Sequence, residues 1–273
     1  MYAVTQTEPM QRSRGEARVA LSRAGDGAVR LAGLRQAGSA KVILPRVAGV
    51  PELVFLNTSG GLTGGDHLSY TAEIGAGVQA VATTQTAERA YRASSGTARV
   101  RVDLTVGAGG FLDWLPQETI LFDGAALDRR THLRLGAGAG CLMLETIVLG
   151  RQAMGESLRR LSLRDWRQIE REGAPLWVEP LVLNDRALMT GSAGLGGMRA
   201  FATLCLIAPE AADLLAPLRR LLDEPGVEAG ASALPGRLML RAHAADGWPL
   251  RRQIARCLGL IRRGRPLPRV WQL

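Results

Sequence analysis

The stretch from Ala98 to Pro116, ARVRVDLTVGAGGFLDWLP, decides the fold class because it contains two strand patterns separated by a tight corner. In its first half, apolar residues from Val100 to Val106 alternate strictly with polar residues from Arg99 to Thr105. This period of two predicts a half-buried strand. The Gly-Ala-Gly that begins at Gly107 supplies the backbone freedom that a tight corner needs, and a second strand is expected after it.

The same unit occurs three times, in AEIGAGVQAVATT, LTVGAGGFLDWLP and LRLGAGAGCLMLE. Gly-Ala-Gly begins at Gly75, Gly107 and Gly136, a spacing of about 30 residues. Such a period favours stacked hairpins or the coils of a solenoid. The alternative is three unrelated glycine turns in an all-β sandwich. Neither interpretation involves alternating strands and helices.

The second half of the chain continues as strands and then adds helices. Residues 161–183 predict two strands joined around Glu172-Gly173, and 209–224 predict a helix that Pro217 kinks or divides. Residues 249–264 predict a second helix, with its buried face running from Leu250 to Ile261. We therefore expect a mainly β, solenoid-like stack with about two α-helices toward the C-terminus. Residues 1–15 are expected to form a flexible segment, and 16–273 a single domain.

Composition narrows the class of partner. The chain of 273 residues has a formal charge of +9, which favours acidic partners, although a GC-rich genome would also enrich arginine. Basic patches interleaved with aromatics are missing, so nucleic-acid binding is not expected. Cys141, Cys205 and Cys257 form no CxxC pair, which fits a reducing compartment. No stretch approaches ~18 apolar residues, so we expect a soluble, cytoplasmic protein without a membrane partner.

The glycine-rich loop NTSGGLTGGD (57–66) raises the question of phosphate binding. Gly60 and Gly65 have the spacing of a P-loop, but Asp66 stands where that loop needs lysine. The alternation after it predicts a strand, so there is no helix N-terminus to bind an anion. The loop is therefore interpreted as a structural turn with Asp66 as its hydrogen-bonding cap.

Carboxylates recur in apolar surroundings farther along the chain. They are Glu118, Asp123, Glu145 and Glu156. Because glutamate is rarely buried alone, salt bridges with Arg89, Arg92 or Arg151 are one interpretation. An acid-lined passage or a polar network at an interface is the other.

Signals for catalysis are weak. His67, His132 and His243 are isolated from one another, and no HExxH or GxSxG motif is present. The residues alone therefore indicate no catalytic arrangement. The alternative is a small-ligand enzyme whose glycine loop frames an active site, which would need a histidine beside an acid and a nucleophile.

Five ordered blocks resemble the UreD family of urease accessory proteins, called UreH in some organisms. They are NTSGGLTGGD (57–66), TTQTAERAYRA (83–93), WLPQETILFDGA (114–125), LGRQAMGE (149–156) and LPRVWQL (267–273). The resemblance implies a β-rich, non-enzymatic scaffold that binds urease apoprotein and UreF, with the GTPase UreG docking through UreF. It also implies two copies in the assembly and an internal tunnel for nickel, with Ni²⁺ in transit and no tightly bound cofactor.

The resemblance also suggests roles for particular residues. Candidates along the nickel path are Asp66, Glu118, Asp123, Glu145 and Glu156. Carboxylates hold a divalent ion loosely, which suits a relay better than clustered histidines would. Candidates for docking UreF lie on the outer face of the C-terminal helix: Arg251, Arg252, Arg256, Arg262 and Arg263. The alternative is a surface helix kept soluble by arginine. Residues before 50 match the family loosely and are assigned no role.

Overall fold

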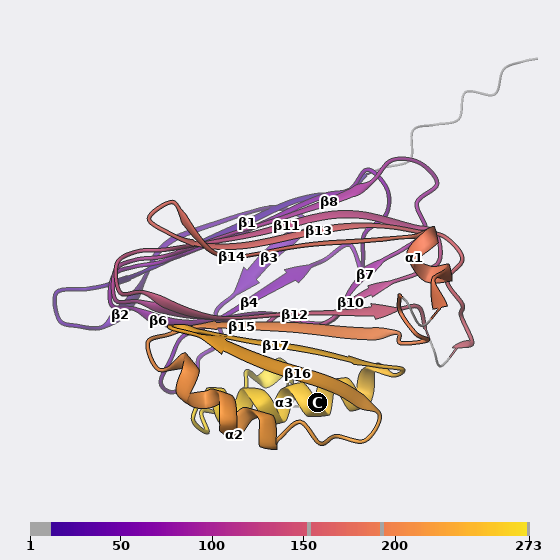
Figure 1. Ribbon diagram of the computed structural model, residues 1–273. Helices are drawn as coiled ribbons and strands as arrows, with labels where there is room; N and C mark the ends of the chain where they lie inside the picture. Colours follow the sequence, from indigo (N-terminus) through magenta and orange to yellow (C-terminus); the bar gives the residue numbers. More distant parts are fainter. Residues whose placement is uncertain (1–11, 152–153, 192–193, 272–273) are drawn as a thin grey trace, which may run out of the picture.

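A computed structural model describes residues 12–151, 154–191 and 194–271, and it consists of two β-sheets covered on one side by helices (Figure 1). Sheet A has the order β14 (Ala174–Asn184), β13 (Leu161–Arg171), β11 (Ala125–Leu135), β8 (Ala98–Val106), β5 (His67–Ile74), β1 (Arg14–Arg23) and β2 (Val29–Gly38). Sheet B has the order β16 (Val227–Leu234), β17 (Arg237–Ala244), β15 (Ala200–Ile207), β12 (Gly140–Leu149), β9 (Phe111–Trp114), β6 (Gln79–Thr84), β4 (Glu52–Asn57) and β3 (Ala40–Ile43). Two short strands, β7 (Glu88–Ala90) and β10 (Thr119–Leu121), pair with each other, and β10 also pairs with β12.

The chain passes back and forth between the sheets as a solenoid. β5, β8 and β11 lie in sheet A, and the strand that follows each of the three Gly-Ala-Gly turns, β6, β9 or β12, lies in sheet B. Neighbouring coils pair in parallel in both sheets. The solenoid interpretation of the repeat is therefore confirmed, and the sandwich of unrelated turns is not what forms.

The three Gly-Ala-Gly turns stack on one another at one end of the solenoid. Gly107 N donates to Ile74 O at 2.7 Å, and Gly136 N donates to Val106 O at 2.8 Å. A Cβ on Gly107 would lie 2.6 Å from the backbone nitrogen of Ala76, closer than real Cβ atoms approach. The repeat needs glycine here because successive turns touch through their backbones.

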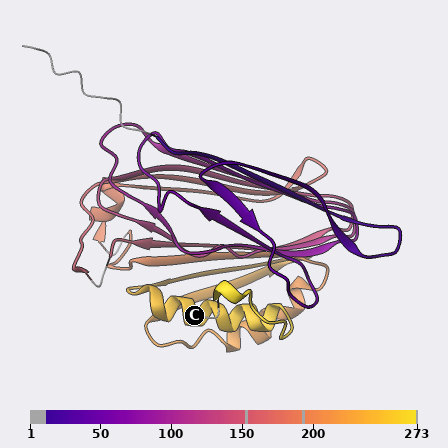
Figure 2. The same ribbon diagram turned by 180° about the vertical axis from the view of Figure 1, so that it is seen from behind.

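Alternation along the strands builds two cores. Val100, Val102 and Leu104 point between the sheets, where Phe55 and Tyr70 also pack. The outer face of sheet B is apolar as well, and it is covered by η3 (Ala211–Leu214), α2 (Leu215–Arg220), α3 (Gly247–Ile261) and η4 (Arg269–Trp271) (Figure 2). The helices thus form a third layer on one side, and the outer face of sheet A is left uncovered.

The expected helices are present, with differences in detail. The segment 209–224 divides between η3 and α2, ahead of Pro217, which lies in the first turn of α2. The buried face of α3 agrees with the prediction, and Gly264 follows its end with a positive φ of 74°. A short helix, α1 (Asp185–Met189), was not predicted from the sequence.

The strand prediction for 161–183 is confirmed by β13 and β14, which the Glu172-Gly173 turn joins. At the N-terminus, the expected flexible segment 1–15 falls mostly on residues 1–11, which lie outside the described residues. β1 already begins at Arg14. Arg14 and Gly15 therefore belong to the sheet.

Candidate functional site

The glycine-rich loop ends at a carboxylate that holds backbone groups. Asp66 is 4% exposed, and it accepts hydrogen bonds from the backbone nitrogens of Ser13 at 2.7 Å and Thr63 at 2.8 Å. Thr63 in turn donates through its hydroxyl to Arg92 O. These contacts confirm Asp66 as the hydrogen-bonding cap of a structural turn.

Two further predicted acids lie together at the edge of the solenoid. Asp123 Oδ1 accepts from the backbone nitrogens of Arg159 and Arg160, and Arg92 pairs with its Oδ2 at 2.9 Å. Glu156 accepts from the backbone nitrogen of Asp123 and pairs with Arg151 at 3.0 Å. The salt-bridge interpretation holds for both acids, and hydrogen bonds from the backbone lower the pKa of Asp123 most strongly.

Glu118 lies on the side of the molecule that carries the helical layer. Its carboxylate pairs with Arg251 of α3 at 3.2 Å, and the guanidinium of Arg251 also donates to Gln117 and stacks over Trp271. Two further hydrogen bonds join the segment before Glu118 to the C-terminal segment, since Gln117 donates to Val270 O and Trp271 donates to Leu115 O. Glu118 therefore helps to anchor the C-terminal segment to the solenoid.

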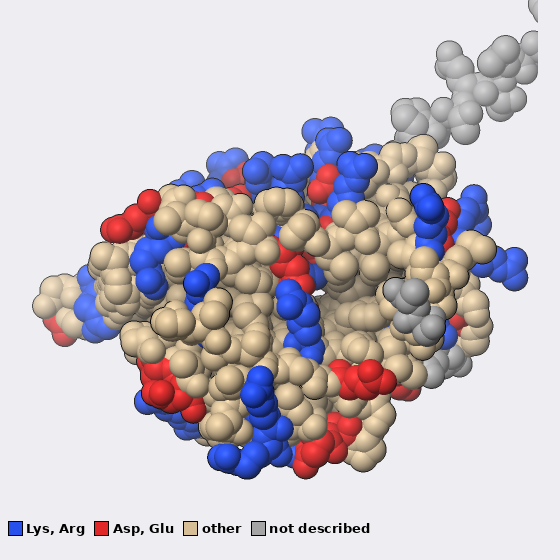
Figure 3. Space-filling view, viewed as in Figure 1, with Lys and Arg blue, Asp and Glu red and all other residues tan. Residues whose placement is uncertain are grey.

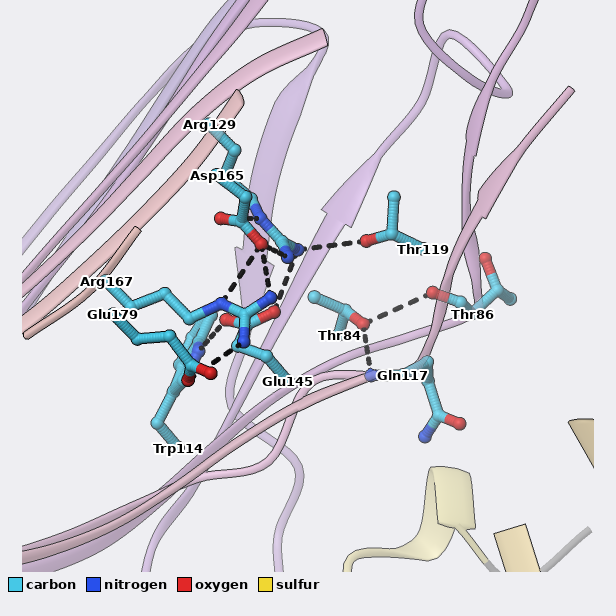
Figure 4. Close-up of polar contacts among 10 residues, drawn as sticks. All are labelled: Thr84, Thr86, Trp114, Gln117, Thr119, Arg129, Glu145, Asp165, Arg167 and Glu179. Atoms are coloured by element: carbon cyan, nitrogen blue, oxygen red, sulfur yellow. Dashed lines mark hydrogen bonds and ion pairs between the residues drawn. The ribbon is translucent and has the colours of Figure 1, made fainter. Parts of the chain in front are cut away.

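Glu145 lies inside the solenoid, within a buried ionic network that joins the two sheets (Figure 4). It is 2% exposed, it accepts from Trp114 Nε1 at 3.0 Å, and it pairs with Arg129 Nη1 at 2.8 Å. Arg129 reaches across from β11 and forms a two-pronged contact with Asp165 of β13, at 3.0 Å and 2.6 Å. We call Trp114, Arg129, Glu145, Asp165, Arg167 and Glu179 the interior network.

The interior network pairs each charge with an opposite one. Arg167 donates from Nε to Asp165 at 3.0 Å and lies 3.6 Å from Glu179 on β14. Burial alone would raise the pKa of Asp165, but the guanidinium groups of Arg129 and Arg167 outweigh it and lower the pKa to about 2. Removing one partner of a buried ion pair leaves an uncompensated charge, so these pairs constrain the relative positions of β11, β12, β13 and β14.

A small cavity lies next to the interior network. Its volume is about 40 Å³, which is large enough for a water molecule, and its polar lining comes from Thr84, Glu88, Gln117 and Thr119 together with Arg129 and Glu145. Thr119 accepts from Arg129 at 3.0 Å and Thr84 accepts from the backbone nitrogen of Gln117 at 2.9 Å. Of the five acids predicted for a nickel path, Glu145 lines this cavity, whereas the other four lie elsewhere.

Glu88 is a cavity carboxylate whose pKa is strongly shifted by its surroundings. Burial raises its pKa to about 7, against the lowering effect of hydrogen bonds from the Arg89 backbone and from Asn57. A carboxylate that titrates near neutrality can exchange a proton for a cation within the physiological range.

Sequence reasoning missed Glu88 and most of the interior network. Arg129, Asp165 and Arg167 occupy core-facing positions of alternating strands, between Leu127 and Leu133 on β11 and between Leu163 and Ile169 on β13. A charge at a core-facing position of a strand was a signal that could have found them. Glu88 lies within the block TTQTAERAYRA, in which only the arginines were considered as charged residues.

The five candidate arginines at the C-terminal helix are all paired within the chain. Arg252 and Arg256 contact Glu224, Arg263 contacts Glu210, and Arg251 contacts Glu118. Arg262 is 3% exposed and binds Asp113 of β9 at 2.8 Å. The prediction that Arg262 lies on the outer face is wrong, because this side chain turns under the helix to neutralise a buried carboxylate.

The structure does not bring the three histidines together. His67 starts β5, His132 lies near the end of β11 beside Glu170, and His243 lies on β17 of the other sheet beside Glu228. In the described parts of the chain, no group of three or more His, Cys, Asp or Glu side chains is placed to hold a metal ion. Within the same residues, no helix is both long and apolar enough to cross a membrane.

Comparison with known proteins identifies the family of this chain. The family model for the UreD urease accessory protein matches residues 13–272. The chain belongs to the UreD family. Urease accessory proteins UreD of Cereibacter sphaeroides, Paracoccus denitrificans and Dinoroseobacter shibae are 66%, 57% and 53% identical. These alignments cover 96%, 97% and 97% of this chain and 96%, 94% and 94% of the relatives. The family role is in urease maturation, as an accessory factor and not as a catalyst.

The residues that carry this family resemblance converge around the cavity. Leu62 comes from the first block, Thr84 and Glu88 from the second, and Gln117 and Thr119 from the third. The terminal block reaches the same region, since Gln117 donates to Val270 O. Segments spread over the UreD sequence thus surround one point inside the solenoid.

Proposed function

We propose that this UreD chain is a non-enzymatic scaffold that binds urease apoprotein and UreF, with UreG recruited through UreF, and passes Ni²⁺ through its interior toward the urease active site. The assembly holds two copies of the chain and works in the cytoplasm. The observation that carries the proposal is the small, mostly apolar cavity with two carboxylates in its wall, around which the family's sequence blocks converge.

The chemistry of the cavity suits a passing divalent cation. Its carboxylates, Glu88 and Glu145, are accompanied by hydroxyl and amide oxygens, which are ligands that bind such ions without trapping them. Glu145 is held by Arg129, so Glu88 is the acid that can release its proton and take up positive charge. Asp66, Asp123 and Glu156 already hold backbone groups, and we assign them to shaping the loops along the route.

A matched set of variants tests the conduit. Glu88→Gln removes the titrating carboxylate with almost no change of volume, and Val102→Phe fills the cavity with an apolar ring. Glu73→Gln is the control, since Glu73 lies on the outside and pairs with Arg18. We expect both cavity variants to lower the nickel content of urease assembled with UreF and UreG, and the control to leave it unchanged.

Co-purification separates the scaffold from the conduit. Each variant is captured with urease apoprotein and UreF before nickel is measured by elemental analysis. Complexes that form normally while nickel loading stays at the wild-type level would remove the cavity from the route. Failure of the wild-type chain to form a complex with either partner would remove the scaffold role as well.

A further inference from the structure

The outer face of sheet A carries its side chains in straight rows. β1, β5, β8, β11 and β13 pair in parallel and in register, so outward residues of neighbouring strands lie side by side. One row runs Arg14, His67, Arg99, Asp128 and Arg164, and the next runs Glu16, Ser69, Arg101, Arg130 and Trp166. We call Arg14, Arg99, Arg101, Arg130 and Arg164 the arginine ladder. Basic side chains along the edge of the molecule that carries β1, β8 and β11 are visible in Figure 3.

The two ends of this face differ in charge balance. Near the Gly-Ala-Gly turns, Arg18 pairs with Glu73, and Arg134 lies within 4 Å of both Asp103 and Glu170. At the opposite end, the guanidinium groups of Arg14, Arg99 and Arg164 have no carboxylate within ion-pair distance among the residues that the structure describes. Three of the five ladder arginines, Arg14, Arg99 and Arg164, therefore keep a positive charge that no ion pair within the described part of the chain neutralises.

The arrangement of the ladder works against the fold. Arg101 and Arg130 are direct neighbours across β8 and β11, and like charges in that position destabilise a sheet. Both are exposed, and their nearest acids, Asp103 and Asp128, lie two residues away on the same strands at 3.3 Å and 3.8 Å. These ion pairs offset part of the repulsion between Arg101 and Arg130, and a partner that carries carboxylates would offset the rest.

The surface around the ladder is hollowed and partly apolar. A groove of about 790 Å³ has four arginines of the ladder and two carboxylates, Glu16 and Asp128, in its wall, so its lining is basic on balance. A second hollow of about 450 Å³ shares Asp128 and Arg130 and adds Arg164 and Trp166. Trp166 is 45% exposed, in register with Arg130. Arginine and tryptophan are the side chains that most often dominate protein interfaces, and arginine binds carboxylates in a two-pronged geometry.

We propose that the arginine ladder is the docking surface for a carboxylate-rich face of urease apoprotein. The inference rests on the proposed function and assigns one of its partners to a surface. The helical layer with the arginines assigned to UreF lies on the opposite side of the molecule (Figure 1), so sheet A is left for the client enzyme. Protein is favoured over nucleic acid because single-stranded nucleic acids need aromatic platforms along the groove, and Trp166 is the one tryptophan in these two rows.

Charge-matched triple variants of the full chain test the proposal. Arg99→Gln/Arg130→Gln/Arg164→Gln removes three charges from the ladder. Arg46→Gln/Arg186→Gln/Arg220→Gln removes three exposed charges elsewhere and alters net charge equally. Affinity for purified urease apoprotein is measured at low and moderate salt, and affinity for UreF is measured in parallel. We expect the ladder variant to lose on the order of tenfold or more in urease affinity, with a weaker salt dependence, while UreF binding is retained.

Other outcomes overturn the proposal in distinguishable ways. Equal urease affinity of the two triple variants, with wild-type binding intact, removes the ladder and leaves the scaffold role standing. Loss of binding to a DNA or RNA oligonucleotide in the ladder variant, with urease affinity unchanged, reassigns the surface to nucleic acid. If the wild-type chain binds neither urease nor UreF, the proposed scaffold role is wrong, and so is the assignment of the ladder. Thermal unfolding of the ladder variant at or above the wild-type temperature excludes misfolding as the cause of a loss.

Discussion

At the scale of single residues, the interior of the solenoid contains charges that the fold must balance. Glu88 and Asp165 illustrate the two directions that burial can take. Asp165 lies between two guanidinium groups and keeps a low pKa, whereas burial outweighs the hydrogen bonds and the charges of Arg89 and Arg129 at Glu88, and its pKa rises to about 7. Each direction gives a different dependence of stability on pH.

For Glu88, stability should fall as pH rises. The folded chain holds the proton of Glu88 more tightly than the unfolded chain does, so the free energy of unfolding decreases between about pH 4.5 and pH 7. Glu88→Gln removes this penalty. We expect it to stabilise the protein by on the order of 2 kcal/mol at pH 8, allowing for partial exposure, and by little at pH 4.5. Urea unfolding at both pH values checks this, and a pH-independent difference from wild type would contradict it.

For Asp165, stability should fall as pH drops. Its pKa is lowered by Arg129 and Arg167, so its contribution is present above about pH 4 and is lost as pH falls through about 2. Asp165→Asn removes the negative charge that neutralises the buried guanidinium groups of Arg129 and Arg167. We expect the free energy of unfolding to fall by about 3–5 kcal/mol at pH 7. Asp128→Asn on the outer face of β11 is the matched control, with a loss below about 0.5 kcal/mol. Similar losses for the two variants in urea unfolding would refute the role of the network.

At the scale of elements, the sequence predicted most of what local pattern controls. The alternation of Val100 to Val106 predicted β8 and its buried face, and the repeat of Gly-Ala-Gly predicted the coils. Pro217 predicted the division of the helix, although the break lies two residues ahead of it. The inward turn of Arg262 could not be read from the sequence, because it depends on Asp113, which is 149 residues away along the chain.

The same separation explains the limits at the candidate site. Glu145 was predicted because it interrupts an apolar run, but its partners Arg129 and Trp114 come from other coils. Which acids face the cavity depends on the register between strands far apart in sequence. Asp66 and Glu156 have equally unusual surroundings in the sequence, and they bind backbone groups at loops instead.

The stacked turns give a prediction at the scale of elements. A Cβ on Gly107 would meet the backbone of Gly75 and Ala76, and neither can move without disturbing the next coil. We expect Gly107→Ala to cost about 1–3 kcal/mol of unfolding free energy. Gly25→Ala, where a Cβ meets nothing within 4 Å, should stay within about 0.5 kcal/mol of wild type. Chemical denaturation of both variants measures the difference, and equal values would show that the turns do not constrain one another.

At the scale of the whole molecule, three layers separate two basic surfaces. The arginine ladder lies on the outer face of sheet A, and the paired arginines of α3 lie on the helical layer beyond sheet B. The interior network and its cavity lie between the sheets. A scaffold with this layout can hold two partners at once, with the cavity between them.

This layout predicts independent docking. Arg252→Gln on α3 combined with Arg263→Gln just after its end should weaken UreF binding several-fold and leave urease affinity unchanged, while the ladder variant should do the reverse. Both arginines are more than half exposed and pair with single acids, so the double substitution should leave the fold intact. Wild-type chain saturated with UreF should then bind urease apoprotein with the same affinity as the free chain, measured by light scattering or biosensor titration. If the two partners compete for the chain, their surfaces overlap, and the assignment of opposite faces to them is wrong.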